Sequence, residues 1–322
     1  MTAARKLLIG VASAAVVAAA LVDFAVRLYV RKLRRTARGG SLTLAFPSER
    51  THTIATPDGA ALHVAECGAG RPIVLLHGWG INIAYWGPLA EVLRDRGFRV
   101  VAVSQRGSRP SSAVTPGVGL PTLASDVETV LDQLDLRDAV LVGQSMGGLV
   151  TQAAAALDRH GGARRVGAIV IMNSTAQLAA SRGRLLTAML SDTALATVLG
   201  GHPRYGLVLT MGAFGRATPH DVVEAARRAA AGEPHEHRRG LARAMLGADL
   251  RSGLQEIDVP TLVLAGGADR VFPLADAEAI VAAIPGAWLR VFPDAGHTLM
   301  LEHPYEVGDE IARFAGAAVA SA

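Results

Sequence analysis

The sequence predicts an α/β fold in which a mostly parallel sheet is covered by helices on both faces. Three observations support this interpretation. Short apolar runs, typical of buried parallel strands, alternate with stretches of helical periodicity through most of the 322 residues. Residues 175–255 interrupt this alternation with helical patterns only, which indicates a helical insertion. A largely apolar stretch near the start of the chain predicts one N-terminal transmembrane helix before the domain.

The N-terminal segment, residues 1–40, is predicted to be a membrane anchor with a basic flank. Residues 7–22 carry no charge, and Asp23 alone interrupts the apolar stretch that continues to Val26. Two basic residues precede this stretch and six follow it, so the positive-inside rule places the domain in the cytoplasm. Two alternatives stay open: a signal peptide cleaved near residues 18–20, with export of the mature protein, and a peripheral amphipathic helix or an unused upstream start.

Composition excludes several partners. The first 40 residues hold eight Lys and Arg and one Asp, whereas the rest holds 24 basic and 27 acidic residues, a net charge of −3. The isoelectric point of about 9.7 therefore belongs to the N-terminal segment, and we infer no nucleic-acid partner. A single cysteine, Cys67, excludes an intrachain disulfide and zinc sites with cysteine pairs. We expect no metal and no cofactor.

The elements of the predicted domain follow one another regularly. A hairpin of two strands at 51–56 and 61–65, joined by Pro57-Asp58-Gly59, comes first. Buried strands are then predicted at 73–76, 99–103, 139–142 and 166–172, with helices at 86–96, 122–134 and 146–157. After the insertion come a strand at 261–265, a helix at 274–284, a strand at 288–291 and a last helix that ends near 314. The domain thus comprises residues 41–174 and 256–322.

The helical insertion is expected to form a cap, or lid, over the active site. Loops beyond the carboxyl ends of parallel strands face the ligand site in α/β folds, and the insertion occupies such a loop. Its apolar residues are candidates to line a substrate pocket, and packing of the cap onto the domain explains each of them equally well. The candidates are Met189, Leu190, Leu207, Met211 and Phe214, with Trp79 and Val271 from outside the insertion.

The segment Gly143-Gln144-Ser145-Met146-Gly147 lies between a predicted strand and a predicted helix. A serine with glycines two residues before and after it, on such a turn, is the pattern of a nucleophile elbow. The tight turn strains the backbone of the serine, and glycine fills positions where a side chain would clash. The helix that starts behind Ser145 offers free N–H groups to a developing oxyanion.

Four motifs occur in a fixed order, each at the end of a strand. They are His77-Gly78-Trp79-Gly80, the serine elbow, Gly266…Asp269…Pro273, and Gly296-His297…Glu302…Pro304. In these motifs, over residues 50–317, the chain resembles the α/β-hydrolase fold family, in particular its serine esterase, lipase and perhydrolase members with a helical cap. The resemblance implies an α/β-hydrolase fold and a Ser-Asp-His triad.

Ser145, His297 and Asp269 are the candidate triad. A serine hydroxyl needs a base, His297 can take its proton, and Asp269 would orient the imidazole. The order Ser, Asp, His is typical of this fold. Backbone N–H groups of Trp79 and Met146 are the candidate oxyanion donors, supported by residues that keep the two loops tight: His77, Gly78, Gly143 and Gly147.

His235 and His237 could suggest a metal site, but their spacing on a polar loop favours a solvated turn.

Many members of the family carry an acid and Arg-Gly-x-Gly-x-Ser after the fourth strand, whereas this chain reads Ser104-Gln105-Arg106-Gly107-Ser108-Arg109-Pro110-Ser111. Some members place the catalytic acid after the preceding strand, where Asn173-Ser174 stands here, which strengthens Asp269.

The sequence therefore predicts a serine hydrolase that cleaves a carboxylic ester through an acyl-enzyme. The apolar cap and the predicted anchor suggest a lipophilic acyl ester, such as a monoacylglycerol, with the lipid bilayer as partner. The elbow also resembles that of cofactor-free haloperoxidases (perhydrolases) and carbon–carbon bond hydrolases. A membrane-tethered binding protein that has kept the fold is the non-enzymatic alternative.

Overall fold

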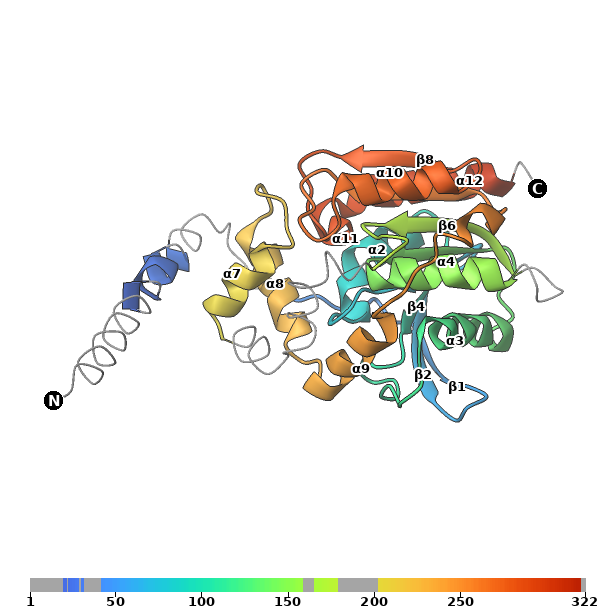
Figure 1. Cartoon of the computed structure of the whole chain (residues 1–322), viewed down its shortest axis with the longest axis horizontal. Helices are drawn as coiled ribbons and strands as arrows, with labels where there is room; N and C mark the ends of the chain where they lie inside the picture. The colour runs from blue at the N-terminus through green and yellow to red at the C-terminus, as the bar shows by residue number, and fades with distance from the viewer. Residues whose placement is uncertain are drawn as a thin grey trace, which may run out of the picture.

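The computed structural model describes residues 20–31 except 22 and 29, and residues 42–158, 165–178 and 202–319. A sheet of eight strands, in the order β1-β2-β4-β3-β5-β6-β7-β8, runs through the middle of this part of the chain (Figure 1). The strands are β1 (Arg50–Ala55), β2 (Ala61–Cys67), β3 (Pro72–Leu76), β4 (Arg99–Ser104), β5 (Ala139–Gln144), β6 (Val166–Met172), β7 (Thr261–Gly266) and β8 (Trp288–Phe292).

The helices alternate with the strands, apart from the insertion. Those of the domain are η1 (Ile83–Trp86), α2 (Gly87–Asp95), α3 (Leu120–Gln133), α4 (Met146–Asp158), α10 (Leu274–Ala283), α11 (Leu299–Glu302) and α12 (Pro304–Val319). Between β6 and β7 the described residues form α7 (Tyr205–Met211), α8 (His220–Ala230), α9 (His235–Met245) and η2 (Leu254–Glu256).

The sheet is mostly parallel, which confirms the predicted fold class. β1 pairs with β2 and β2 with β4 in antiparallel fashion, and every other pair of neighbours, from β4 across to β8, is parallel. The first two strands form the predicted hairpin, with Arg50 opposite Glu66 and Ala55 opposite Ala61. Because parallel strands share one direction, the ends of β3, β5, β6 and β7 meet along one edge of the sheet.

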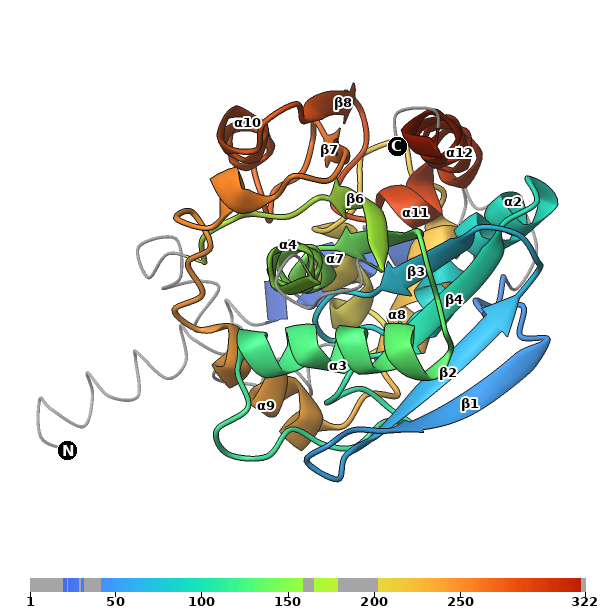
Figure 2. The ribbon, with the colours of Figure 1, turned by 90° about the vertical axis from the view of Figure 1, so that its right-hand side faces the viewer.

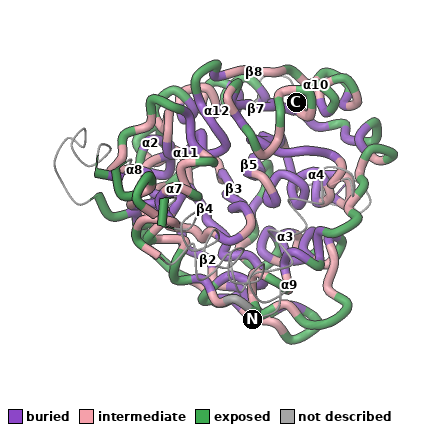
Figure 3. The backbone as a smooth tube through the Cα atoms, turned by 60° about the vertical axis from the view of Figure 1, so that its left-hand side comes forward, coloured by how far each residue is buried: buried purple, intermediate pink, exposed green. Residues whose placement is uncertain are grey.

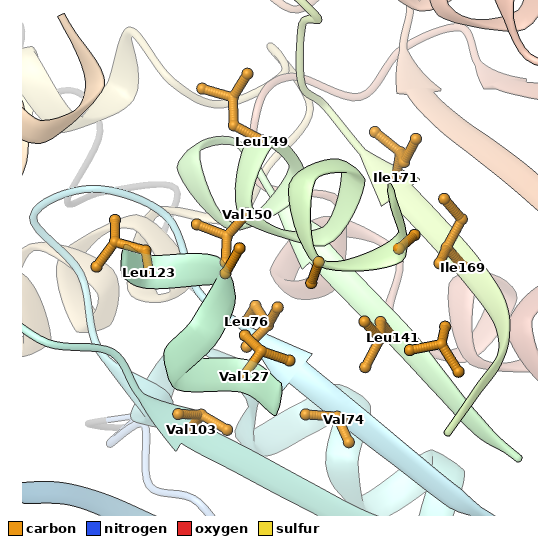
Figure 4. Packing of buried hydrophobic residues seen from close by; sticks show 14 of the residues in the cluster. Val74, Leu76, Val103, Leu123, Val127, Leu141, Leu149, Val150, Ile169 and Ile171 are labelled. Atoms are coloured by element: carbon orange, nitrogen blue, oxygen red, sulfur yellow. The ribbon is translucent and has the colours of Figure 1, made fainter. Parts of the chain in front are cut away.

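Side chains alternate between two apolar layers along each central strand. Val74 and Leu76 of β3 join the cluster formed with α3, α4 and α10, whereas Ile73 and Leu75 join the cluster formed with α2 and α12. Figure 2 shows the helices on both faces of the sheet, and Figure 4 shows the first layer from close by. Apart from Pro72, Arg99 and Gly167 near the strand starts, the residues of the central strands are buried (Figure 3), so the sheet is a rigid support for the loops at its edge.

The helical insertion lies at the end of the molecule toward which the arrowheads of β6 and β8 point (Figure 1). Residues 20–31 lie at the same end, where Val26 and Val30 pack against the cluster that includes cap residues. One expectation for the insertion was wrong: His235 and His237 stand on the first turn of α9, not on a solvated loop. Pro234 ends the extended segment before them, and its fixed φ is compatible with the start of a helix.

The predicted membrane span, residues 7–26, falls mostly outside the described residues. Among the residues that are described, no helix is both long and apolar enough to cross a bilayer. Leu21, Phe24 and Leu28 are nevertheless between 52% and 64% exposed, on a segment that also exposes Arg27 and Arg31. The cap candidates Met189 and Leu190 also lie outside the described residues.

Candidate active site

Ser145 stands on a sharp turn between β5 and α4. Its φ is +56°, in the left-handed region that non-glycine residues rarely adopt, and it is the single half-buried residue in a run of buried ones. Its backbone N–H donates to the carbonyl of Met172 at 3.0 Å, and its carbonyl accepts from Ser174 Oγ at 2.7 Å. These contacts hold the strained turn against the end of β6.

Glycines around Ser145 permit the close approach of three segments. A Cβ at Gly147 would lie 1.9 Å from the carbonyl oxygen of Leu76, and one at Gly143 would lie 2.1 Å from that of Gly147. A Cβ at Gly78 would lie 2.4 Å from Gln144 Oε1 and 3.2 Å from Ser145 Cβ. The loop after β3 therefore touches the elbow directly, as an oxyanion loop must.

His297 and Asp269 are paired at the same edge of the sheet. The distance from His297 Nδ1 to Asp269 Oδ2 is 2.8 Å. Asp269 Oδ1 accepts the N–H groups of Val271 at 2.7 Å and Phe272 at 3.1 Å. Because the carboxylate can only accept, Nδ1 carries the hydrogen, and the lone pair of Nε2 is left for a proton from a nucleophile.

The carboxylate of Asp269 is kept ionised. Burial acts to raise its pKa, but the adjacent His297 and the N–H groups of Phe272 and Val271 act in the opposite direction and hold the pKa below its usual value. The side chain is fully buried. A buried carboxylate that remains charged stabilises an imidazolium beside it, which is the role of the acid in a catalytic triad.

Asn173 connects the acid to the histidine loop. It follows β6, has a φ of +45°, and donates from Nδ2 to Asp269 Oδ2 at 2.8 Å and to the carbonyl of Gly296 at 3.1 Å. The carbonyl of His297 accepts from Gln144 Nε2 at 2.8 Å. Gln144, the residue before Ser145, thus fixes the histidine loop. The end of β6, where some members of the family carry the catalytic acid, supplies the amide of Asn173 instead.

His77 supports the oxyanion loop from a fully buried position. The N–H of Gln105 donates to His77 Nε2 at 3.2 Å, so Nδ1 carries the hydrogen and donates to the carbonyl of Gly78 at 2.8 Å. Gln105 Nε2 also donates to the carbonyl of His77 at 2.5 Å. Burial lowers the pKa of His77 to about 4, so the ring stays neutral near pH 7.

The divergent loop 104–111 supplies this support. Arg106, which is 2% exposed, forms ion pairs with Asp126 and Asp58, both at 2.6 Å, and so fixes the backbone beside Gln105. The pKa of Arg106 is raised by Asp126 and Asp58. Sequence reasoning missed Gln105, and the departure of this loop from the family pattern was the signal that could have found it.

The two candidate oxyanion donors stand on the two loops that meet. Met146 is the first residue of α4, where a helix leaves its N–H groups without intrahelical acceptors. Trp79 lies in the turn after β3, and its indole Nε1 donates to the carbonyl of Arg238 in α9 at 2.8 Å. That contact turns the indole toward the cap, so the side chain joins the oxyanion loop to the insertion.

The remaining pocket candidates lie on the cap and beside the acid. Phe214 is 4% exposed and its backbone contacts Gly296, while Met211 is half-buried on α7. Val271 is half-buried beside the acid. Cys67 lies buried in β2, where burial raises the pKa of its thiol to about 11. No group of three or more metal-ligating side chains occurs in the described residues.

Comparison with known proteins places this geometry in a family. Residues 71–304 match the family described as alpha/beta hydrolase fold. The chain belongs to this family.

Particular relatives divide into two kinds. A non-heme haloperoxidase of Rhodococcus erythropolis is 30% identical over 272 residues, which cover 81% of this chain and 98% of the relative. The solved esterase of Exiguobacterium antarcticum superposes with a TM-score of 0.74 at 25% identity and covers 83% of this chain and 100% of its own. A thermophilic esterase of Thermogutta terrifontis gives a TM-score of 0.69 at 27% identity, over 84% of this chain and 99% of its own.

Proposed function

We propose that this hydrolase cleaves carboxylic esters through an acyl-enzyme on Ser145. The observation that carries the proposal is the 2.8 Å pair of His297 Nδ1 and the buried, ionised Asp269, at the sheet edge where the strained Ser145 stands. The pair leaves Nε2 of His297 as a base, and the elbow raises a hydroxyl from the sheet.

The proposed reaction has two halves. Ser145 Oγ attacks the ester carbonyl carbon while its proton passes to His297 Nε2, and the N–H groups of Met146 and Trp79 donate to the oxyanion. The carbon–oxygen bond to the alcohol then breaks, and the alcohol leaves with the proton from Nε2. Water next gives a proton to Nε2 and attacks the acyl carbon, and the carboxylic acid departs as Ser145 regains its hydrogen.

The proposed substrate is a lipophilic acyl ester such as a monoacylglycerol. Apolar cap residues support this class of substrate, among them Met211 and Phe214, the latter with its backbone against Gly296 beside the histidine. We also propose that residues 7–26 hold the enzyme at the membrane with its domain in the cytoplasm; export after cleavage is the alternative. The apolar sequence, the basic residues that follow it and the exposed Leu21, Phe24 and Leu28 support the anchor.

Perhydrolysis is a second candidate, favoured by the non-heme haloperoxidase relative. In that reaction hydrogen peroxide replaces water in the second half, so that the acyl-enzyme gives a peracid and Ser145 is restored. The residues are the same, and only the choice of acyl acceptor differs. A comparison of peracid and acid formed from one ester, with and without peroxide, separates the two activities.

The test of the proposed function is labelling by a fluorophosphonate probe, with wild type and Ser145→Ala compared in membrane and soluble fractions. We expect labelling and ester hydrolysis in the wild type only, since the probe needs an activated serine. Full esterase activity in Ser145→Ala would refute the mechanism. Labelling confined to the soluble fraction would retain the chemistry and refute the anchor.

A further inference from the structure

Glu302 lies where the catalytic histidine loop meets the cap. It ends the short helix α11, five residues after His297. Its carboxylate is half-buried and accepts from five donors on two segments far apart in the sequence. The donors are Gly296 N (3.1 Å), Thr298 N (3.2 Å), Thr298 Oγ1 (3.0 Å), Gly215 N (2.7 Å) and Thr218 Oγ1 (2.9 Å).

The five donors fall into two groups. Gly296 and Thr298 flank His297 on either side, so the carboxylate fixes the backbone that carries the imidazole. Gly215 and Thr218 belong to the link between α7 and α8, within the cap. All five donors are neutral groups that donate to a charged acceptor, a class of hydrogen bond about twice as strong as a neutral pair.

The histidine itself also contacts the cap. The N–H of His297 donates to the carbonyl of Ala213 at 2.6 Å. A Cβ at Gly296 would lie 2.5 Å from the carbonyl carbon of Phe214, and a Cβ at Gly215 would lie 2.1 Å from the carbonyl oxygen of Asp294. The two backbones therefore touch without side chains between them, so a shift of the cap link would displace the histidine loop.

We propose that Glu302 is a positioning residue that couples the seating of the cap to the alignment of His297. This inference rests on the proposed function, since it assigns His297 as the base. The cap link 213–218 and the loop 296–298 share one carboxylate. The imidazole reaches its reactive position only when both segments are hydrogen-bonded to the Glu302 carboxylate.

The test uses full-length enzyme, with kcat and KM measured for one p-nitrophenyl ester and the active sites counted by fluorophosphonate titration. For Glu302→Gln, whose amide N–H groups would face N–H donors, we expect kcat per active site to fall about 100-fold with KM changed much less. For Thr218→Val, which removes only a cap donor, we expect a fall of about 3- to 10-fold in kcat.

The double variant decides whether the two residues act together. Coupling through one carboxylate predicts that Thr218→Val has no further effect on kcat in a Glu302→Gln background. Thr210→Val is the matched control, because Thr210 Oγ1 donates to the carbonyl of Gly206 within α7 and does not reach Glu302. We expect wild-type kcat for this control.

Several results would overturn the inference. One is a Glu302→Gln enzyme with a lowered melting temperature and wild-type kcat per active site, because Glu302 would then stabilise the fold only. A second is an unchanged kcat in Thr218→Val, and this variant also tests the inference if Glu302→Gln does not fold. A third is full additivity of the two effects on kcat in the double variant. Because wild type and Ser145→Ala are assayed beside these variants, failure of the proposed function is seen separately.

Discussion

At the scale of single residues, His77 shows how burial decides what a histidine does. Both of its ring nitrogens are engaged, one by the N–H of Gln105 and the other by the carbonyl of Gly78. A proton added to Nε2 would face an N–H donor inside the protein. The pKa of His77 in the fold is about 4, because burial penalises the imidazolium, whereas an unfolded chain has a histidine pKa of about 6.5.

This difference in pKa makes stability depend on pH. Between these two pKa values the unfolded chain binds more protons than the folded protein, so the free energy of unfolding rises with pH across that window and the stabilisation is lost as the pH falls through it. We expect His77 alone to lower the free energy of unfolding by about 2 kcal/mol from pH 7 to pH 5. Urea unfolding of wild type and His77→Gln at several pH values measures it, and parallel pH dependences would contradict it.

The candidate triad could be predicted because each member stands in a short motif at a strand end. Ser145, Asp269 and His297 need only their immediate neighbours to be recognised. The role of Asn173 could not be predicted, because it is set by a contact with Asp269, which lies 96 residues away along the chain. No local pattern records such an approach.

At the scale of elements, α4 packs on β3 with no side chain between their backbones at Gly147. A Cβ there would lie 1.9 Å from the carbonyl oxygen of Leu76 and 2.9 Å from that of His77. Backbone atoms of a central strand cannot move aside without disturbing its neighbours. The approach sets the distance between the helix that carries Met146 and the loop that carries Trp79.

We therefore expect Gly147→Ala to destabilise the protein by about 3 kcal/mol, since the added methyl overpacks two rigid elements. The same change at Gly316, on α12 with open space around a Cβ, is the control and should be neutral or stabilising by up to about 1 kcal/mol through helix propensity. Thermal or urea unfolding of both variants measures the difference. Equal stabilities would show that the elbow tolerates the methyl group.

Element by element, the strands were easier to predict than the helices. Buried strands leave continuous apolar runs, and each predicted strand occurs within a residue or two of its observed bounds. Helix ends depend on local capping: Asn82 caps η1 by accepting from the N–H of Ala84 at 3.0 Å, a separate turn that the pattern did not predict. Within the insertion the sequence predicted helical patterns without separate bounds, and the described residues there form α7, α8 and α9.

At the scale of the whole molecule, cap and domain share one apolar layer. Leu207, Phe214 and Val223 of the cap belong to the same cluster as residues of α2, α12 and the sheet. Polar contacts reinforce this layer, since Tyr85 donates to the carbonyl of Ala226 at 2.7 Å. The insertion is thus part of the folded core and not an appended module.

This shared layer predicts that cap and domain unfold together. Single-tryptophan variants can report on each part: Trp79 lies against the cap at Arg238, and Trp288 packs on Phe314 at the far edge of the sheet. We expect their fluorescence transitions in urea to coincide with each other and with the loss of helical circular dichroism. An earlier transition at Trp79 would show that the cap unfolds on its own.

Because the cap and residues 20–31 lie at one end of the molecule, positive and negative charge are unevenly distributed between its two ends. Among the described residues, 20–31 and 202–255 together have a net charge of +4, whereas 42–158, 165–178 and 256–319 together have a net charge of −9. The described part of the protein is therefore an electric dipole whose positive pole is the end that carries the cap (Figure 1). In the field of an anionic surface such a dipole feels a torque that turns its positive pole inward, and salt weakens that torque by screening. The edge of the sheet that holds Ser145 would then face the surface before any contact is made.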